Sequence, residues 1–506
     1  MTFNIRIDSR TFDILPLKPF KTEVKRLDWT AFGGPDQALV SAFVPAERLL
    51  DFASLLRCPL TVSDHTAVPA WWGYINTIII HYHQVKFTIT LDELFNKVKV
   101  LYTFLAPDSF TSELNETAFS QDPFSQKEYG VKERVLLRQG IDEGFALALR
   151  DIFLQRSADP RSTLAPSLDS PDLRIDFHCK GWIHTLGWRF YQDLEGFYAN
   201  HGPGPGQVPS GDGINHGIAQ RIFVKKQVNL KYLSFMVRKF GSPASDTQAM
   251  VWPDAPGPAP NFNALVSSQV INGSSFSLSA YNWVQYTFSP PFPLSANTFY
   301  WVGFVPNISD ANNYYYLRID ENSSFHPVSD LFAMRFDLPS YTFQHIPNLT
   351  QPGLNPDLYF RALCSIDSGL LLKNIVTATG DFITNINTFS SGVPALPYRV
   401  GGLSTLEEIN TLMHLGTANQ RLILANVDLD RRLTFYEQPP EDQPTAWMDQ
   451  HGRFYDQHRV LLPSWRPPIG QYAALAGADH FVPRFDHRRI PAYFVDRFTY
   501  RPPTYG

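Results

Sequence analysis

The chain has 506 residues, of which 14% are aromatic, 18% are charged and 40 are proline. This length is too great for one hydrophobic core and predicts about three or four domains. A hydrophobic content of 44% excludes a disordered chain, and a net charge of −5 offers no basic footprint for nucleic acid. No apolar run approaches the roughly 20 residues of a membrane span, and charges interrupt the N-terminal segment where a secretion signal needs an apolar core. We therefore expect a folded protein made in a cytoplasm, without nucleic-acid recognition or membrane insertion.

The first predicted domain, residues 1–109, consists of β-strands. Strand patterns occur at Ala38–Val44, Leu60–Val62, Trp72–Ile80 and Val85–Leu91. Apolar residues occupy nearly every position of the third of these, so we expect that strand to be buried on both faces. We interpret the domain as a small β-barrel.

The second predicted domain, residues 110–200, is mixed α/β. A helix is expected near Glu143–Gln155, and Leu173–Trp182 alternates as a strand with Ile175, Phe177 and Cys179 on one face. The segment 201–213 then carries five glycines and three prolines. We interpret it as a linker without regular structure.

Residues 214–362 carry many short strands divided by turn residues, which predicts an inserted β-sandwich of jelly-roll type. The last predicted domain, 363–506, has helices at Ser368–Thr377 and Ser404–Leu415, the second with a capping box from Ser404 to Glu407. A hairpin turning at Asp428–Asp430 and a Pro-rich tail follow. The expected fold class is mainly β (α+β), with small β-barrel domains, a few helices and an inserted β-sandwich.

No catalytic motif is present in the sequence. It contains no G-x-S-x-G, H-E-x-x-H or phosphate-binding loop. The carboxylate pairs Asp92–Glu93 and Glu407–Glu408 are typical of helix starts. We therefore expect no enzyme activity and no catalytic residue, although a sugar-hydrolysing acid pair among the 48 acidic residues stays open.

A metal site and a cofactor are not expected either. His81 and His83 lie on one face of a strand, but no third ligand is near in the sequence. The cysteines Cys58, Cys179 and Cys364 are too scattered for a disulfide framework or a zinc site, and we expect them to be small buried hydrophobes.

Aromatic residues in the predicted sandwich are the best candidates for ligand binding. Sugars stack their apolar faces on aromatic rings, while polar side chains beside them bind the hydroxyl groups. The strand Asn312–Asp320 supplies both kinds of group. Its alternate tyrosines are either core residues or an exposed platform. The predicted glycan-binding residues are Trp252, Tyr314, Tyr316, Arg318 and Asp320.

Several segments together resemble the tail-hub or baseplate-hub proteins of tailed bacteriophages. The resemblance lies in CPLTV…WWGYI…VKFTITLDELFNKVKVLY (58–102), in EYGVKE (128–133) and in the strand and turn of 173–191. It continues in the helix and hairpin of 406–435 and in PPIGQY (467–472). The segment 214–362 resembles the carbohydrate-binding-like sandwiches inserted into such proteins, in the patterns at 219–224, 230–241, 283–288 and 300–302.

This resemblance implies a structural virion protein located at the tail tip. Hub proteins form homotrimeric rings that contact the tail tube, the tape-measure protein and tail-tip or fibre proteins. Host-surface polysaccharide is the implied ligand of the insert, which could instead only support neighbouring proteins. The implied assembly contacts are Trp71, Trp72, Leu94 and Phe95. A polysaccharide-degrading enzyme and a free-standing adhesin remain as alternatives.

Overall fold

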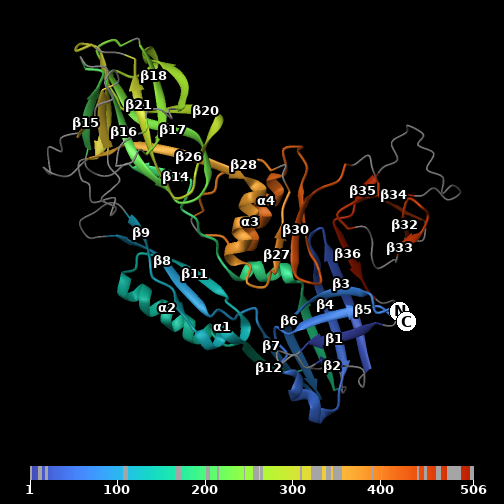
Figure 1. The fold of residues 1–506 in the computed structure, drawn as a ribbon. Coiled ribbons are helices and arrows are strands. Elements are labelled where there is room, and N and C mark those ends of the chain that lie inside the picture. The colour runs from blue at the N-terminus through green and yellow to red at the C-terminus, as the bar shows by residue number, and fades with distance from the viewer. Residues whose placement is uncertain are drawn as a thin grey trace. The chain divides into compact units, whose positions relative to one another are not determined.

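The computed structural model consists of two compact units, of which unit 1 comprises 1–191, 368–393 and 401–506, and unit 2 comprises 192–367 and 394–400. The residues that the structure describes are 3–8, 14–16, 21–105, 112–166, 173–200, 205–212, 216–243, 245–254, 261, 266–307, 310–320, 333–337, 343–345, 356–389, 392–399, 402–440, 444–449, 453–462, 469–475 and 492–501. Strands far outnumber helices in both units, which confirms the mainly β fold class (Figure 1).

The largest sheet of unit 1 gathers strands from both ends of the chain. Its central strand order is β2-β1-β5-β6-β13-β4-β29-β30-β27. In addition, β3 pairs with β4 and β36, and β7 pairs with β6 and β12. The strands are β1 (Asn4–Asp8), β2 (Ile14–Pro16), β3 (Lys21–Thr30), β4 (Phe32–Phe43), β5 (Pro59–Ser63), β6 (Pro69–Tyr82), β7 (Val85–Thr90), β12 (Arg161–Pro166), β13 (Arg174–Lys180), β27 (Asn385–Asn387), β29 (Ile423–Val427), β30 (Arg432–Glu437) and β36 (Arg497–Tyr500).

Strand β6 lies at the centre of this sheet and is buried on both faces, as its apolar run predicts. Strand β13 pairs with β6 on one side and β4 on the other, and it buries Ile175, Phe177 and Cys179 as expected. The indole N–H of Trp72 donates to the carbonyl oxygen of Val427 at 3.0 Å. Chain segments about 350 residues apart are therefore joined within one sheet.

A second sheet of unit 1 is covered by helices on one face (Figure 1). It contains β8 (Lys97–Leu105), β9 (Ser112–Glu116), β10 (Ser120–Gln121) and β11 (Glu133–Gln139), and the helices are α1 (Pro123–Tyr129) and α2 (Glu143–Ser157). The α2 helix matches the predicted helix to within two residues. Its Ala146 packs into a core with Val98, Val100 and Leu136 from the sheet.

The C-terminal part of unit 1 adds two helices and a small sheet. These are α3 (Ser368–Thr379), α4 (Thr405–Leu415), β31 (Ala446–Met448), β32 (Phe454–Tyr455), β33 (Leu461–Leu462), β34 (Tyr472–Leu475) and β35 (Ala492–Phe494), besides the short 3-10 helices η1 (Ala46–Phe52) and η2 (Trp182–Trp188). The predicted capping box of α4 is confirmed, and Gly416 ends the helix with a φ of 80°. The hairpin of β29 and β30 also forms as expected.

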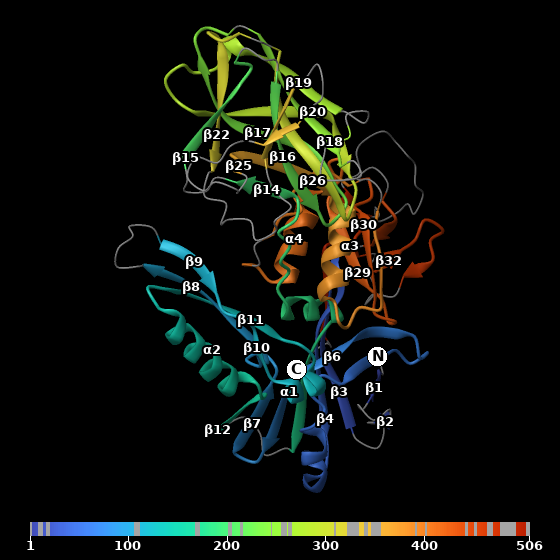
Figure 2. The same ribbon diagram turned by 60° about the vertical axis from the view of Figure 1, so that its left-hand side comes forward.

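Unit 2 is a sandwich of two sheets (Figure 2). The first sheet contains β14 (Phe197–Asn200), β15 (Pro205–Ser210), β17 (Val228–Phe240), β20 (Asn282–Leu294), β22 (Tyr314–Asp320), β25 (Asp357–Leu358), β26 (Phe360–Asp367) and β28 (Pro394–Ala395). The second contains β16 (His216–Val224), β18 (Asp246–Pro253), β19 (Val266–Asn272), β21 (Thr298–Pro306), β23 (Ala333–Asp337) and β24 (Phe343–His345). Both sheets contribute to one core, for example Phe235 and Tyr315 from the first and Phe304 from the second.

Two local predictions are wrong. Part of the supposed linker 201–213 is strand β15, which pairs with β22 from Pro205 to Ser210. Proline has no backbone N–H group to donate. An edge strand tolerates proline because a backbone N–H group that faces away from the neighbouring strand forms no hydrogen bond within the sheet. The pair Asp92–Glu93 lies in a turn after β7 and does not begin a helix.

Removing the α4 cap should destabilise unit 1. The Ser404 backbone N–H donates to the Glu407 carboxylate at 2.7 Å, and the Glu407 N–H donates to the Ser404 hydroxyl. The Ser404 hydroxyl also donates to the Glu407 carboxylate at 2.7 Å, and this bond, followed by the one from the Ser404 backbone N–H, holds the pKa of Glu407 below its usual range. We expect Ser404→Ala to lower the free energy of unfolding by about 1 kcal/mol, measured by urea denaturation. Thr388→Ala, at an exposed position of the same unit, is the control; equal stability of both variants would contradict the role of the cap.

Candidate functional site

The outer surface of the first sheet of unit 2 carries a concentrated set of aromatic and arginine side chains. Residues on β17 and β22 alternate, so that Val237 and Leu317 enter the core while Arg238 and Tyr316 face away from it. We call this surface the arginine–aromatic face. It is formed by Gln207, Arg238, Phe240, Tyr281, Trp283, Tyr314, Tyr316, Arg318 and Arg361.

Two tyrosines and a phenylalanine form one end of the arginine–aromatic face. Phe240 lies opposite Tyr314 across the β17–β22 pair, with ring centroids 4.7 Å apart. The hydroxyl groups of Tyr314 and Tyr316 are 2.8 Å apart. Burial and then this hydrogen bond raise the pKa of Tyr314 to about 12, so the Tyr314 hydroxyl is neutral at neutral pH. The half-exposed rings offer an apolar surface with polar tips.

The arginines of this face lie against aromatic rings. The Arg238 guanidinium is 4.8 Å from the Tyr316 centroid and 5.1 Å from that of Tyr281. Arg318 lies 5.4 Å from the same Tyr281 ring, and Arg361 lies 4.0 Å from Trp283. Such cation–π contacts fix the planar guanidinium groups while leaving N–H donors for a ligand.

A glutamine links two members of the face. Arg238 and the Tyr281 hydroxyl both donate to the Gln207 side-chain oxygen, at 3.0 and 2.7 Å. Strand β15 holds Gln207 directly opposite Arg318 on β22. The polar groups are therefore positioned by strand pairing before any ligand binds.

Three of the five residues predicted from the sequence to bind glycan lie on this face, namely Tyr314, Tyr316 and Arg318. Trp252 does not, and the prediction that it joins an exposed platform is wrong. It is 1% exposed and packs with Trp301 on the opposite surface of the sandwich, since its neighbour Val251 fills the core between the sheets. Asp320 is completely buried and is no part of an exposed surface.

Six further members of the face were not among the predicted glycan-binding residues: Gln207, Arg238, Phe240, Tyr281, Trp283 and Arg361. They lie on β15, on β17, on β20 or just before it, and on β26. The alternation of β17 marked Arg238 as outward-facing once its core positions were known. No local pattern could show that these strands are neighbours.

One pair of acidic residues that strand pairing brings together in unit 2 is inaccessible. Asp320 and Asp357 lie opposite each other across β22 and β25, and both are buried. Burial, opposed by a hydrogen bond from Gln220, raises the pKa of Asp357 to about 7, and the charge of Asp320 adds to this effect. A carboxyl pair without exposed surface cannot reach a polysaccharide in this structure.

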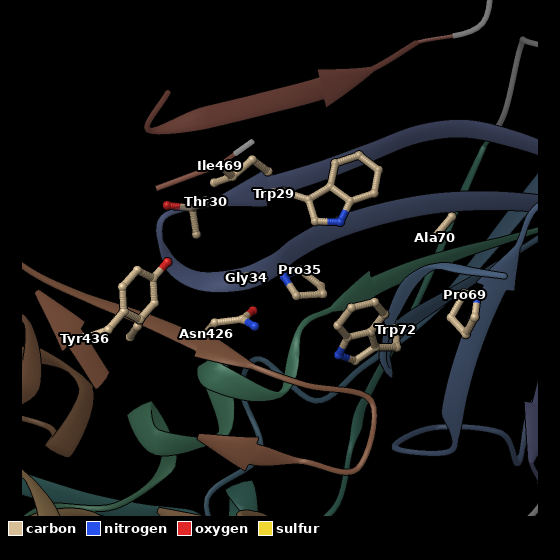
Figure 3. A pocket seen from close by; sticks show the side chains of 11 residues that line it. Trp29, Thr30, Gly34, Pro35, Pro69, Ala70, Trp72, Asn426, Tyr436 and Ile469 are labelled. Atoms are coloured by element: carbon tan, nitrogen blue, oxygen red, sulfur yellow. The ribbon is translucent and has the colours of Figure 1, made fainter. Parts of the chain in front are cut away.

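The residues predicted as assembly contacts are mostly interior to unit 1. Trp71 and Leu94 are 0% exposed, so the prediction that they contact another subunit is wrong. Phe95 is half-buried against Phe153. Trp72 lines a hollow of about 320 Å³, where its indole, the indole of Trp29 and the phenol ring of Tyr436 surround Pro35 and Asn426 (Figure 3). The hollow is aromatic and uncharged, and nothing in it identifies a ligand.

His81 and the three cysteine residues are buried and paired with other groups or free of disulfides. His81 pairs with Asp176 at 3.0 Å and is buried. Cys58, Cys179 and Cys364 are buried free thiols, and burial raises the pKa of Cys364 to about 12. Among the residues that the structure describes, no three metal-binding side chains converge. None of the helices in these residues has the length and apolarity to span a bilayer.

One buried lysine of unit 1 is also strongly perturbed. Lys132 is 5% exposed, donates to the Leu91 carbonyl oxygen and lies 5.0 Å from the Trp188 ring. Burial lowers its pKa to about 7, whereas the charge of Asp92 acts in the opposite direction. A perturbed group can mark a functional site, but Lys132 is itself buried and does not line the hollow described above, so we interpret it as a structural residue.

Comparison with known proteins gives no family. No family model matches the chain, and no curated protein matches it. Among solved structures, the cysteine protease and lectin-like domains of Cwp84, a surface layer associated protein of Clostridium difficile, match at 10% identity, covering 40% of this chain and 42% of that one, with a TM-score of 0.25. This chain thus spans less than half the length of that protein.

Two further solved structures match over a larger part of the chain. A carbohydrate-binding module of the β-sandwich superfamily matches at 8% identity over 59% of this chain and 95% of its own, with a TM-score of 0.16. The VP2 subviral particle of infectious bursal disease virus matches at 8% identity, with coverages of 68% and 80% and a TM-score of 0.16. These likenesses are too weak to assign a function.

The buried Lys132 should make stability depend on pH. The unfolded lysine has a pKa of ~10.4, so between about pH 7 and 10 the unfolded chain binds more protons than the folded one, and stability rises with pH. Replacing Lys132 by Met removes this contribution. From about pH 7 to about pH 9, we expect the free energy of unfolding of the wild type to rise by roughly 2 kcal/mol more than that of K132M. Urea denaturation of both proteins at both pH values measures this difference. Lys373→Met, at an exposed position of α3, should behave like the wild type; a parallel pH profile for K132M would contradict the prediction.

Proposed function

We propose that this chain is a structural and adhesive protein without catalytic activity, and that unit 2 binds glycans through the arginine–aromatic face. The observation that carries the proposal is the arrangement of the face itself. Half-exposed rings of Tyr314 and Tyr316 lie beside the N–H donors of Arg238 and Arg318 on one regular sheet.

This arrangement matches the chemistry of a sugar ring. A pyranose has an apolar face of C–H groups, which stacks on an aromatic ring, and a rim of hydroxyl groups that accept and donate hydrogen bonds. Tyr316 offers the ring, and Arg238, held in place by Tyr281 and Gln207, offers the donors beside it. A flat sheet surface suits a polymer that passes over it, since the rings are not enclosed in a pocket.

We further propose that unit 1 is a subunit of a bacteriophage tail hub. The segments that resemble hub proteins are scattered from residue 58 to residue 472, yet all of them belong to unit 1. The bond from Trp72 to Val427 joins two of them directly. This meeting in space supports the reading that they are parts of one host fold into which unit 2 is inserted.

The proposed hub is a homotrimer in the virion, in contact with tail-tube, tape-measure and tail-tip proteins. Three copies of a weak sugar-binding face would act together on a cell surface, because the second and third contacts form at high effective concentration. An enzyme that degrades polysaccharide is the alternative class. A free-standing adhesin is another, and it leaves unit 1 without a role.

Shortening a platform tyrosine should weaken glycan binding. Tyr316→Ala removes the ring from the centre of the face, and we expect binding on a glycan array to weaken about fivefold to tenfold, because an aromatic contact is worth ~1 kcal/mol. Tyr82→Ala removes an exposed tyrosine of unit 1 and is the matched control. Unchanged binding by Y316A, or no binding by the wild type to any glycan, would refute the proposed surface.

The hub proposal predicts a trimer in solution. Light scattering on the purified chain should give about three times the mass of one chain. The same sample should release no reducing ends from the glycans that it binds. A stable monomer that cleaves a glycan would exclude the hub and favour the enzyme.

A further inference from the structure

The arginines of the arginine–aromatic face form no ion pair with the acidic residues that the structure describes. In the described part of unit 2, Arg238, Arg318 and Arg361 have aromatic or amide partners and no carboxylate partner. Other basic side chains of the same unit are paired, such as Arg221 with Asp254 and Lys226 with Asp193. The face therefore concentrates positive charge on a chain whose net charge is −5.

Two acidic groups lie near the ends of this face in the described residues, and neither pairs with its arginines. Asp320, two residues beyond Arg318, is buried beside Asp357. Asp212 acts on the other end of the face, where its charge contributes to the raised pKa of Tyr314. At the centre the field is positive: burial raises the pKa of Tyr281, whereas Arg238 and Arg318 both act to lower it.

The guanidinium groups are placed for oxyanions. A guanidinium presents paired N–H donors in one plane, which match the two oxygens of a carboxylate or phosphate. Arg238 and Arg318 share the Tyr281 ring as a support, and their strands are neighbours in the sheet. An oxyanion held there would lie beside the Tyr316 ring on which the sugar stacks.

We propose that the arginine–aromatic face selects acidic glycans, with the sugar ring on Tyr316 and its carboxylate or phosphate group between Arg238 and Arg318. This inference rests on the proposed glycan-binding function and narrows it to sugar polymers that carry an oxyanion. A neutral polysaccharide would use the rings and leave the charges of the arginines without a partner.

The test uses the full chain and two forms of one polymer. Polygalacturonate and its fully methyl-esterified form have the same backbone and differ in charge. At about 50 mM salt we expect the acid form to bind at least about tenfold more tightly, and at about 500 mM salt this preference should largely disappear, since exposed charge pairs are screened. A phosphodiester-linked polymer of the teichoic-acid type, measured in parallel, shows whether phosphate serves better than carboxylate.

The variants separate charge from stacking. Arg238→Gln and Arg318→Gln should each weaken binding of the acid form about fivefold more than binding of the ester form. The acid form loses a charge-assisted hydrogen bond, whereas the ester form loses only the weaker hydrogen bonds to its hydroxyl groups. Tyr316→Ala should weaken both forms. Lys225→Gln removes a charge from an exposed position of unit 2 outside the face and should change neither. Thermal unfolding of each variant confirms that it is folded.

The outcomes are distinguishable. Equal binding of the acid and ester forms, insensitive to salt, would overturn the selection of acidic glycans and leave the glycan-binding function standing. No binding of either form, nor of any array glycan, would overturn the function itself. If an oligothymidylate competes as tightly as polygalacturonate, the face binds polyanions of any kind and the inference fails.

Discussion

The strict alternation of side chains along β22 is the constraint on which the proposed binding surface depends. Tyr315, Leu317 and Ile319 enter the core of the sandwich, and the Tyr315 hydroxyl donates to the Ser245 carbonyl oxygen at 3.0 Å. With these side chains fixed inward, Tyr314 and Tyr316 can only face outward. A one-residue shift of the strand would bury the tyrosines of the face and expose the core, so the energy of the core also fixes the chemistry of the surface.

The period of the strands could be read from the sequence, but not which strands are neighbours. Alternation separated the two sets of residues in Tyr314–Asp320 correctly and left open which set faces inward. It could not show that Trp252 lies on the other side of the sandwich, since that depends on the sheet to which β18 belongs. Arg238 and Tyr281 were not among the predicted binding residues for the same reason, because they reach Tyr316 only through the pairing of strands distant in the sequence.

In unit 1 the sequence predicted elements better than roles. The helix and hairpin near the C-terminus have local signals, namely a capping box and a tight turn, and these formed as expected. No local sequence pattern shows which residues an apolar side chain will contact. Trp71 and Leu94 look alike in the sequence whether they fill a core or contact another subunit, and only the pairing of β6 with β5 and β13 shows that Trp71 is interior.

The edge strand β15 has a further consequence for the proposed homotrimer. It ends the strand order of its sheet, and an uncovered sheet edge can recruit a strand from another molecule. Pro205 and Pro209 interrupt the row of N–H groups that such a strand would need. The prolines that made this segment resemble a linker thus hinder the pairing of a further strand with this edge of the sheet. Copies of unit 2 held side by side can meet the same surface without fusing their sheets.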